Sequence, residues 1–161
     1  METKYELDRE KLQLNVTREF VADINKVWRA WTEAEMLDQW WGPQPWYVIT
    51  KFMYFSEEGK WLYSMNGPAG EKHWSVMEYL EIKPEEFFSS NHSFCDEHGF
   101  VIDKLKTPLW EISFARSGNS TMVKVQITYQ REEDLDTILE MGFKEGFAMG
   151  HSQLDELLKT I

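Results

Sequence analysis

The sequence contains one cysteine, Cys95, in 161 residues. A single thiol cannot form an internal disulfide, so noncovalent forces must hold the fold together, and a reducing compartment is expected. No run of residues approaches the roughly 18 apolar positions that a membrane-spanning helix needs. The N-terminal residues 1–11 are charged throughout and lack the apolar core of a secretion signal. We therefore predict a cytoplasmic protein.

Positive charge is also scarce. The chain has 17 Lys and Arg against 28 Asp and Glu, which gives a net charge of -11 at pH 7. Nucleic acids and anionic membranes would repel such a surface. Neither is predicted as a partner, and the acidity is expected to serve solubility.

The motifs of common catalytic and cofactor sites are absent from the sequence. The four histidines, His73, His92, His98 and His151, are scattered without the spacing of metal ligands. There is no phosphate-binding glycine loop, zinc-protease helix or serine-hydrolase elbow. We therefore predict no metal, no cofactor and no catalytic residue.

Aromatic residues, in contrast, make up 15% of the chain, and eight of them are tryptophans. This exceeds the needs of a generic fold and indicates an aromatic-lined interior or interface. Trp40 and Trp41 stand directly before the turn residues Gly42 and Pro43. One of the two rings is expected in the core, and the other at the mouth of a cavity or on a partner surface.

The C-terminal segment from Glu132 to Ile161 carries apolar residues at the period of an α-helix. One helix over this range would be roughly 40 Å long, enough to cross a small domain. Gly142, Gly146 and Gly150 fall within its apolar stripe at four-residue spacing, and each costs about 1 kcal/mol relative to alanine. The missing side chains either allow close packing against a sheet or leave room for a ligand. The stripe consists of Leu135, Ile138, Leu139, Phe143, Phe147, Met149, Leu154, Leu157 and Leu158.

The preceding sequence predicts a first strand over 12–21, two short helices and six further strands. The first helix is expected to begin at Ile24 or Asn25 after an Asp23 cap, and the second to span 33–40 with Thr32 as its cap. Short turns imply an antiparallel meander. The order predicts one α+β domain over 1–161, with a charged lead-in at 1–11 and a curved sheet of about seven strands wrapping the C-terminal helix. The six strands are expected at Trp46–Phe55, Gly59–Asn66, Lys72–Ile82, Phe87–Phe94, Leu109–Arg116 and Thr121–Gln130.

Several stretches resemble the activator of heat-shock-protein-90 ATPase homologue-like family of the START-like, helix-grip (SRPBCC) superfamily, which includes the birch-pollen-allergen fold. The likeness covers roughly 12–159, and it implies an apolar cavity between the long helix and the curved sheet. Two positions depart from the family pattern: Asp23, where proline is usual, and Met77, where glycine is common. The matching stretches are Arg18-Glu19-Phe20, Val27 to Thr32, Glu35-Met36-Leu37, Trp40 to Pro43, Gly59 to Trp61, Gly67 to Gly70, Glu81 to Glu86, and Gly142 through Gly146 to Leu154 and Leu158.

Alternation along the strands predicts which side chains face such a cavity. If Ile82 pairs with Phe88 across the turn at Pro84, antiparallel register sets Glu78 opposite His92. That pair could orient a ligand or act as acid and base, could be a structural ion pair, or could be lost through a one-residue slip. The predicted ligand-binding residues are Trp41, Trp61, Met65, Glu78, His92, Phe94, Trp110, Ile112, Phe114, Gly146, Phe147, Met149, Gly150 and Leu154.

The sequence thus predicts a non-catalytic protein that holds a small hydrophobic or amphipathic molecule between helix and sheet. One alternative is an enzyme of the cyclase, dehydratase or hydrolase type found elsewhere in the superfamily, with Glu78 and His92 as acid and base. A second is a protein-interaction module, by analogy with the chaperone regulators that give the family its name. A homodimer through exposed tryptophans or a sheet edge is compatible with the sequence.

Overall fold

One antiparallel sheet and four α-helices make up residues 2–161, the part of the chain that the computed structural model describes. The sheet has eight strands in the order β1-β2-β8-β7-β6-β5-β4-β3, so β1 and β3 are its edges. The helices are α1 (Ile24–Thr32), α2 (Ala34–Trp40), α3 (Glu132–Glu140) and α4 (Phe143–Leu158), and a short 3-10 helix lies at Lys104–Lys106. The strands are β1 (Lys4–Asp8), β2 (Gln13–Phe20), β3 (Tyr47–Met53), β4 (Lys60–Asn66), β5 (Lys72–Lys83), β6 (Phe87–Cys95), β7 (Leu109–Ser117) and β8 (Ser120–Thr128).

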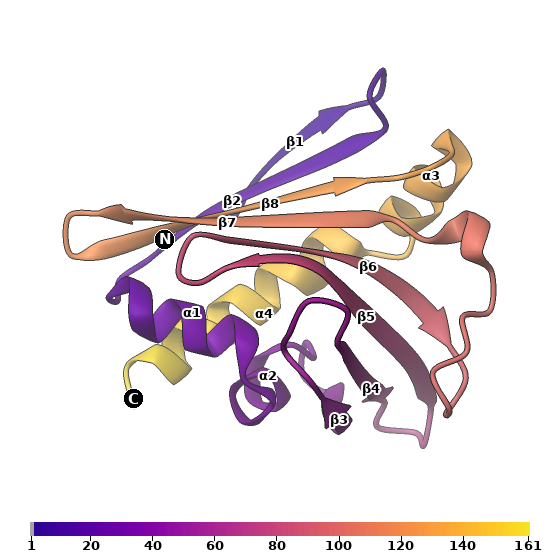
Figure 1. The fold of residues 1–161 in the computed structure, drawn as a ribbon, viewed down its shortest axis with the longest axis horizontal. Helices are drawn as coiled ribbons and strands as arrows, with labels where there is room; N and C mark the ends of the chain where they lie inside the picture. Colours follow the sequence, from indigo (N-terminus) through magenta and orange to yellow (C-terminus); the bar gives the residue numbers. More distant parts are fainter. Residues whose placement is uncertain (1) are drawn as a thin grey trace.

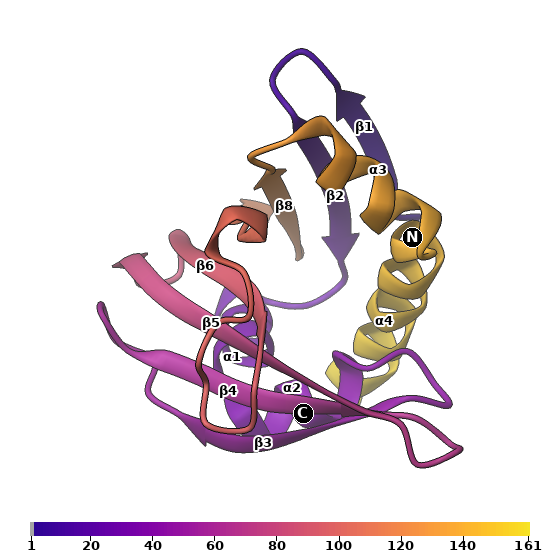
Figure 2. The same ribbon diagram turned by 90° about the vertical axis from the view of Figure 1, so that its right-hand side faces the viewer.

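The sheet is strongly curved, and α4 lies across its concave side, as Figure 2 shows. Figure 1 shows α4 crossing the strand directions at an angle, with α1 and α2 at one end of the molecule. The concave face of the sheet and the inward face of α4 form the main core, in which Val16, Trp61, Ile112 and Leu154 are at most 1% exposed. The predicted α+β helix-grip fold is confirmed. None of the helices within residues 2–161 is both long and apolar enough to cross a membrane.

The alternation of β2 was correctly predicted. Leu14, Val16 and Phe20 are completely buried, and Arg18 shares their inward face with 3% exposure. The Arg18 guanidinium donates to both carboxylate oxygens of Asp155 on α4. A buried charge of this kind requires a hydrogen-bonded partner, so the ion pair explains how arginine occupies an otherwise apolar row.

The N-terminal segment was predicted only to be a charged lead-in, and the structure places a strand within it that the sequence analysis did not predict. Residues 4–8 form β1, which pairs antiparallel with β2 and gives the sheet its eighth strand. The apolar Tyr5 and Leu7 alternate with charged residues, which is a strand pattern that the high charge of the segment concealed. The Tyr5 hydroxyl donates to the Lys144 carbonyl, so this edge strand is also tied to α4.

The two short helices lie where they were expected, although their caps differ. Asp23 occupies the N-cap of α1, but its side chain makes no capping hydrogen bond. Glu33, and not Thr32, is the N-cap of α2. The Thr32 hydroxyl instead donates to the carbonyl of Trp28 within α1. Of the two adjacent tryptophans, Trp40 is buried in the core at 1% exposure, as predicted for one of them.

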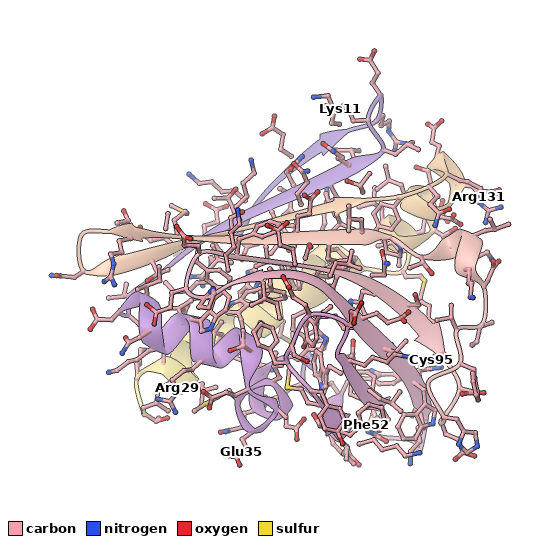
Figure 3. All side chains as sticks on the ribbon, in the orientation of Figure 1. Lys11, Arg29, Glu35, Phe52, Cys95 and Arg131 are labelled. Atoms are coloured by element: carbon pink, nitrogen blue, oxygen red, sulfur yellow. The ribbon has the colours of Figure 1, made fainter. Side chains whose placement is uncertain are left out.

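The C-terminal segment is two helices rather than the single long helix that was predicted. Gly142 has a φ of 84°, a left-handed conformation that glycine adopts without steric cost and that ends helical progression. The break separates α3 from α4 and changes the direction of the chain (Figure 1). Arg131 at the start of α3 and Lys11 at the β1–β2 turn lie toward the same end of the molecule (Figure 3). Ion pairs from Arg9 to Glu132 and Asp136 join these two regions.

A second, smaller cluster covers the outer face of the sheet. It contains the buried Leu62, Val76 and Cys95, with Phe52, Trp74 and Val101 packed against them. Phe52 and Cys95 mark this region in Figure 3. The outer cluster explains why Glu78 on β5 was wrongly predicted to face the cavity: both faces of this strand carry apolar residues. Its inward residues are Met77 and Tyr79, which belong to the main core, so Met77 does not occupy the cleft described below.

Candidate functional site: a cleft between the helices and the sheet

A cleft of about 790 Å³ opens between α3, α4 and one end of the sheet. The sheet contributes residues of β4, β5, β6 and β7, and the turn after α2 contributes Trp41, Pro43 and Trp46. On the helical side, α3, the Gly142 break and the first turns of α4 complete the wall. The break therefore shapes the cleft, because it directs α3 over the mouth instead of continuing the line of α4.

Aromatic rings form most of the inner wall. The ring centroids of Trp41 and Trp110 lie 5.9 Å apart, and Phe147 lies edge-on to Trp110 at 5.9 Å. Phe143 stacks on Phe147 at 5.0 Å, one helical turn away. These rings hold one another in place through edge-to-face and stacked contacts. They present flat apolar surfaces that would favour the apolar part of a ligand.

Three polar side chains meet at the deep end of the cleft. The indole nitrogen of Trp41 donates to the Tyr63 hydroxyl over 3.0 Å. That hydroxyl lies 2.7 Å from Nε2 of His92, within hydrogen-bonding distance. We call this group the Trp41–Tyr63–His92 cluster. Nδ1 of His92 makes no hydrogen bond to any residue that the structure describes, so one ring nitrogen is left for a ligand.

Burial keeps this cluster uncharged. Desolvation lowers the pKa of His92 from 6.5 to about 4, so the imidazole is neutral at pH 7. Desolvation likewise raises the pKa of the Tyr63 phenol well above its usual range. The cluster can therefore donate and accept hydrogen bonds without carrying a charge. The charged residues that line the cleft are Lys106 and Asp134, and Asp134 is already paired with Arg131 at 3.0 Å.

The predicted pairing of Glu78 with His92 is wrong. Ile82 does pair with Phe88, as expected, but an irregularity between Tyr79 and Ile82 shifts the register by one residue. His92 is therefore opposite Met77, and Glu78 lies on the other face of β5 beside Lys60, at 3.8 Å. A β-bulge of this kind inserts an extra residue on one strand and reverses the facing of every residue beyond it.

Each of the three glycines in the C-terminal segment has a different role. Gly142 supplies the left-handed turn between α3 and α4. A Cβ atom at Gly146 would meet only the Pro43 ring, at 3.6 Å, and this glycine lines the cleft. A Cβ atom at Gly150 would lie 3.2 Å from the Trp40 carbonyl oxygen, so this glycine serves close packing between α2 and α4. Gly146 therefore leaves space on the cleft wall, whereas Gly150 allows close packing, against α2 and not against the sheet as predicted.

The structure brings together about half of the predicted ligand-binding residues. Those that line the cleft are Trp41, Met65, His92, Phe94, Trp110, Gly146 and Phe147. Four are buried in the core outside the cleft lining: Trp61, Ile112, Phe114 and Leu154. Met149 is 47% exposed on α4, and Gly150 and Glu78 lie elsewhere, as described above. Phe94 is 54% exposed, which places it at the rim.

Several lining residues were not predicted. Tyr63 could have been found, because it shares the inward face of its strand with Trp61 and Met65. Ile138 was placed in the apolar stripe but not among the ligand-binding residues, and Thr137 and Met141 were not assigned to that stripe. Within residues 2–161, no group of three or more His, Cys, Asp or Glu side chains is arranged to hold a metal ion.

The sequence matches the family model described as "Activator of Hsp90 ATPase homolog 1-like protein" over residues 21–159. The chain belongs to this family. No curated protein shows a significant match to the sequence. The family match agrees with the resemblance carried by the tryptophan-rich segment before β3 and by the glycines of the C-terminal helices.

Solved structures of similar bacterial proteins share the fold over nearly their whole length. Protein Ms6760 from Mycobacterium smegmatis is 27% identical, with a TM-score of 0.90 over 98% of this chain and 97% of its own. A protein from Arthrobacter aurescens is 29% identical, with a TM-score of 0.90 over 98% and 92%. Protein NE0264 from Nitrosomonas europaea is 25% identical, with a TM-score of 0.84 over 96% and 97%.

Proposed function

We propose that this member of the family binds a small, uncharged and mainly apolar molecule in the cleft between α3, α4 and the sheet. The observation that carries the proposal is a cleft of about 790 Å³ with aromatic walls and a polar cluster at its deep end. Sites for small molecules are commonly about 300–1,000 Å³, mostly apolar, with a few polar groups that fix orientation. The cleft has each of these properties.

Affinity would come from burial of the apolar part of the ligand. Each 100 Å² of apolar surface removed from water is worth roughly 2.5 kcal/mol before the entropy lost on binding is subtracted. Trp110, Phe143 and Phe147 provide the surface for this contact. Because the rings already contact one another, little ordering of the wall is needed when a ligand binds.

The polar cluster favours an uncharged ligand group. His92 is neutral at pH 7, and Tyr63 keeps its proton, so neither can neutralise a carboxylate or an ammonium group buried beside them. A hydroxyl or carbonyl group could instead exchange a hydrogen bond with the free Nδ1 of His92. We therefore expect alcohols, ketones or ethers rather than acids or amines at the deep end.

The two alternatives have less support. The acid–base pair on which the enzyme hypothesis depended is not formed, because Glu78 on β5 and His92 on β6 lie on opposite faces of the sheet. The protein-interaction hypothesis rests on the family name. A reducing compartment such as the cytoplasm agrees with the single, buried Cys95, and we keep it as part of the proposal.

The proposal can be tested with Nile red, an uncharged fluorescent dye that carries a carbonyl oxygen. Wild-type protein should raise and blue-shift its fluorescence with saturable binding. Gly146→Leu should weaken binding at least tenfold, because the new side chain projects from the cleft-lining position beside Pro43. Met149→Leu is the matched control on the same helix, since Met149 is exposed outside the cleft, and it should bind as the wild type does. Equal binding by all three proteins would refute a ligand site in this cleft.

A further inference from the structure

Two buried polar atoms behind the cleft have no hydrogen-bond partner among residues 2–161. They are Nε1 of Trp31 on α1 and Nε2 of His151 on α4, and neither hydrogen-bonds to any of residues 2–161. Trp31 is 2% exposed and His151 is 1% exposed. A buried donor or acceptor without a partner costs about 1–3 kcal/mol, so two such atoms close together point to a bound group that satisfies both.

The two atoms are complementary in chemistry. An indole nitrogen can only donate a hydrogen bond. The other nitrogen of His151, Nδ1, lies 3.0 Å from the Thr3 hydroxyl. When Nδ1–H donates to Thr3, Nε2 keeps its lone pair and can only accept. A group that bridges the two atoms must therefore accept from Trp31 and donate to His151, as a hydroxyl group does.

The rings of Trp31 and His151 are direct neighbours. Their centroids lie 5.9 Å apart, and the rings are inclined at 60°. One oxygen that makes two hydrogen bonds of about 2.9 Å bridges nitrogens up to about 5.8 Å apart, a reach comparable with this ring separation. The other rings packed around His151 are those of Phe20, Trp40 and Phe147. The two phenylalanines carry no polar side-chain atom, and the Trp40 indole N–H already donates to the Ala30 carbonyl over 2.8 Å.

Arg18 adds a third feature to this region. Its side chain is 3% exposed, and its Nε also lacks a partner among the described residues. The guanidinium lies over Phe20, 5.0 Å from the ring centroid, and Phe20 contacts His151 at 5.5 Å. Its positive charge, added to burial, lowers the pKa of His151 to about 3, which keeps the imidazole neutral. A neutral ring preserves the acceptor that a hydroxyl group needs.

The site is next to the cleft and separated from it by one ring. Phe147 lines the cleft, and its centroid is 4.3 Å from that of His151, one helical turn along α4. Trp31 lies 6.4 Å from the same phenylalanine. Rotation of the Phe147 side chain is the movement that would bring these two nitrogens into contact with the cleft.

We propose that Trp31 and His151 form an inner hydroxyl site, in which one hydroxyl group accepts from Trp31 Nε1 and donates to His151 Nε2. Water fills this role in the unliganded protein. The hydroxyl of an alcohol replaces the water when its apolar chain lies in the cleft, and this second role rests on the proposed function. The inference extends the ligand class from uncharged molecules in general to alcohols.

The water role is tested by solution NMR of the uniformly ¹⁵N-labelled protein. The indole N–H signal of Trp31, assigned by its loss in Trp31→Phe, should show a nuclear Overhauser effect to bound water. His151→Phe should abolish this effect, with His151→Leu as the substitute if that variant does not fold. His92→Phe is the matched control, because it removes the other buried imidazole and should leave the effect intact. The inner site is overturned if the wild type shows no effect or if the His151 variant keeps it.

The alcohol role is tested with two isomers, 1-hexanol and 1-methoxypentane, which differ in having a hydroxyl or an ether oxygen. Hexanol should displace the water signal at Trp31 and bind the wild type about five- to tenfold more tightly than it binds His151→Phe. The ether should bind both proteins equally. If hexanol shows no preference, the alcohol role is overturned while the cleft still binds ligands. If neither isomer binds, the alcohol role is overturned and the proposed function itself is contradicted. The nuclear Overhauser effect between Trp31 and bound water then still tests whether the inner site exists.

Discussion

The hydroxyl of Tyr63 lies 2.7 Å from Nε2 of His92, and the two residues come from β4 and β6, on either side of β5. Both side chains face the concave side of the sheet and are neutral at pH 7 because burial disfavours their charged forms. The deep end of the cleft therefore offers hydrogen bonds without charge. This relationship determines what kind of ligand the cleft can accept.

Removing the Tyr63 hydroxyl should weaken ligand binding. In Tyr63→Phe, Trp41 loses its acceptor and His92 loses its partner, so the deep end no longer holds the imidazole in one orientation. We expect Nile red to bind about three- to tenfold more weakly, measured by fluorescence titration. Tyr79→Phe is the control, because Tyr79 is a buried tyrosine of the neighbouring strand outside the cleft lining. Equal losses in both variants would show that the effect is structural.

Two buried histidines should make the protein less stable in acid. Burial lowers the pKa of His92 to about 4 and, with the Arg18 charge, that of His151 to about 3, against 6.5 for an exposed imidazole. Below pH 6.5 the unfolded chain binds protons that the native imidazoles do not, so the free energy of unfolding falls as the pH falls toward 4. Each histidine contributes at most about 1.4 kcal/mol per pH unit in this window and nothing above about pH 7.

Urea unfolding between pH 4 and pH 8 measures this effect. Carboxylates also titrate at the acid end, so the comparison is between the wild type and the variants His92→Gln and His151→Phe. Each variant should show a smaller loss of stability between pH 6.5 and pH 5 than the wild type. If the free energy of unfolding depends on pH in the same way in all three proteins, neither imidazole is buried in its neutral form.

Alanine should be tolerated differently at Gly146 and Gly150. At Gly146 the new methyl group makes an ordinary contact with Pro43, so the gain of helix propensity, about 1 kcal/mol, should appear as added stability. At Gly150 the methyl group meets the Trp40 carbonyl oxygen at 3.2 Å, and this backbone is fixed by α2. We expect no gain or a net loss of stability at Gly150. In thermal denaturation, the melting temperature of Gly146→Ala should therefore be higher than that of Gly150→Ala. The opposite order would contradict the assigned packing.

The ion pair between Arg18 and Asp155 should be far more important for stability than the one between Lys60 and Glu78. Asp155→Asn leaves the Arg18 charge buried without its counterion and should cost about 2–4 kcal/mol. Glu78→Gln alters a pair whose side chains are 47% and 39% exposed, so it should change stability by less than about 1 kcal/mol. Chemical denaturation of both variants makes the comparison. Similar small losses would mean that solvent reaches Arg18.

The fold was largely predictable because it depends on periodicity. The alternation of β2 and β8 and the short helices around Trp31 and Trp40 gave strong local patterns, and the family resemblance supplied their arrangement. The helix break at Gly142 was harder to predict, because glycine within an amphipathic stripe is equally consistent with a continuous helix. The first strand was missed because its alternation, Tyr5 and Leu7, lies within a charged segment.

The candidate site was only half predictable, and for Glu78 the reason lies in β5. Its outer residues Trp74 and Val76 are apolar because the segment around Val101 covers that face, so apolar character did not reveal which side was inward. The bulge between Tyr79 and Ile82 then moved His92 out of register with Glu78. Neither feature has a local sequence signal, since each depends on what packs against the strand.

Native mass spectrometry of the protein purified from its own host tests the central claim most directly. The account predicts that wild-type protein retains a small, uncharged molecule at one copy per chain and that Gly146→Leu, purified in the same way, does not. Wild-type protein that is repeatedly without a bound molecule, together with no binding in a screen of uncharged alcohols, ketones and ethers, would contradict it.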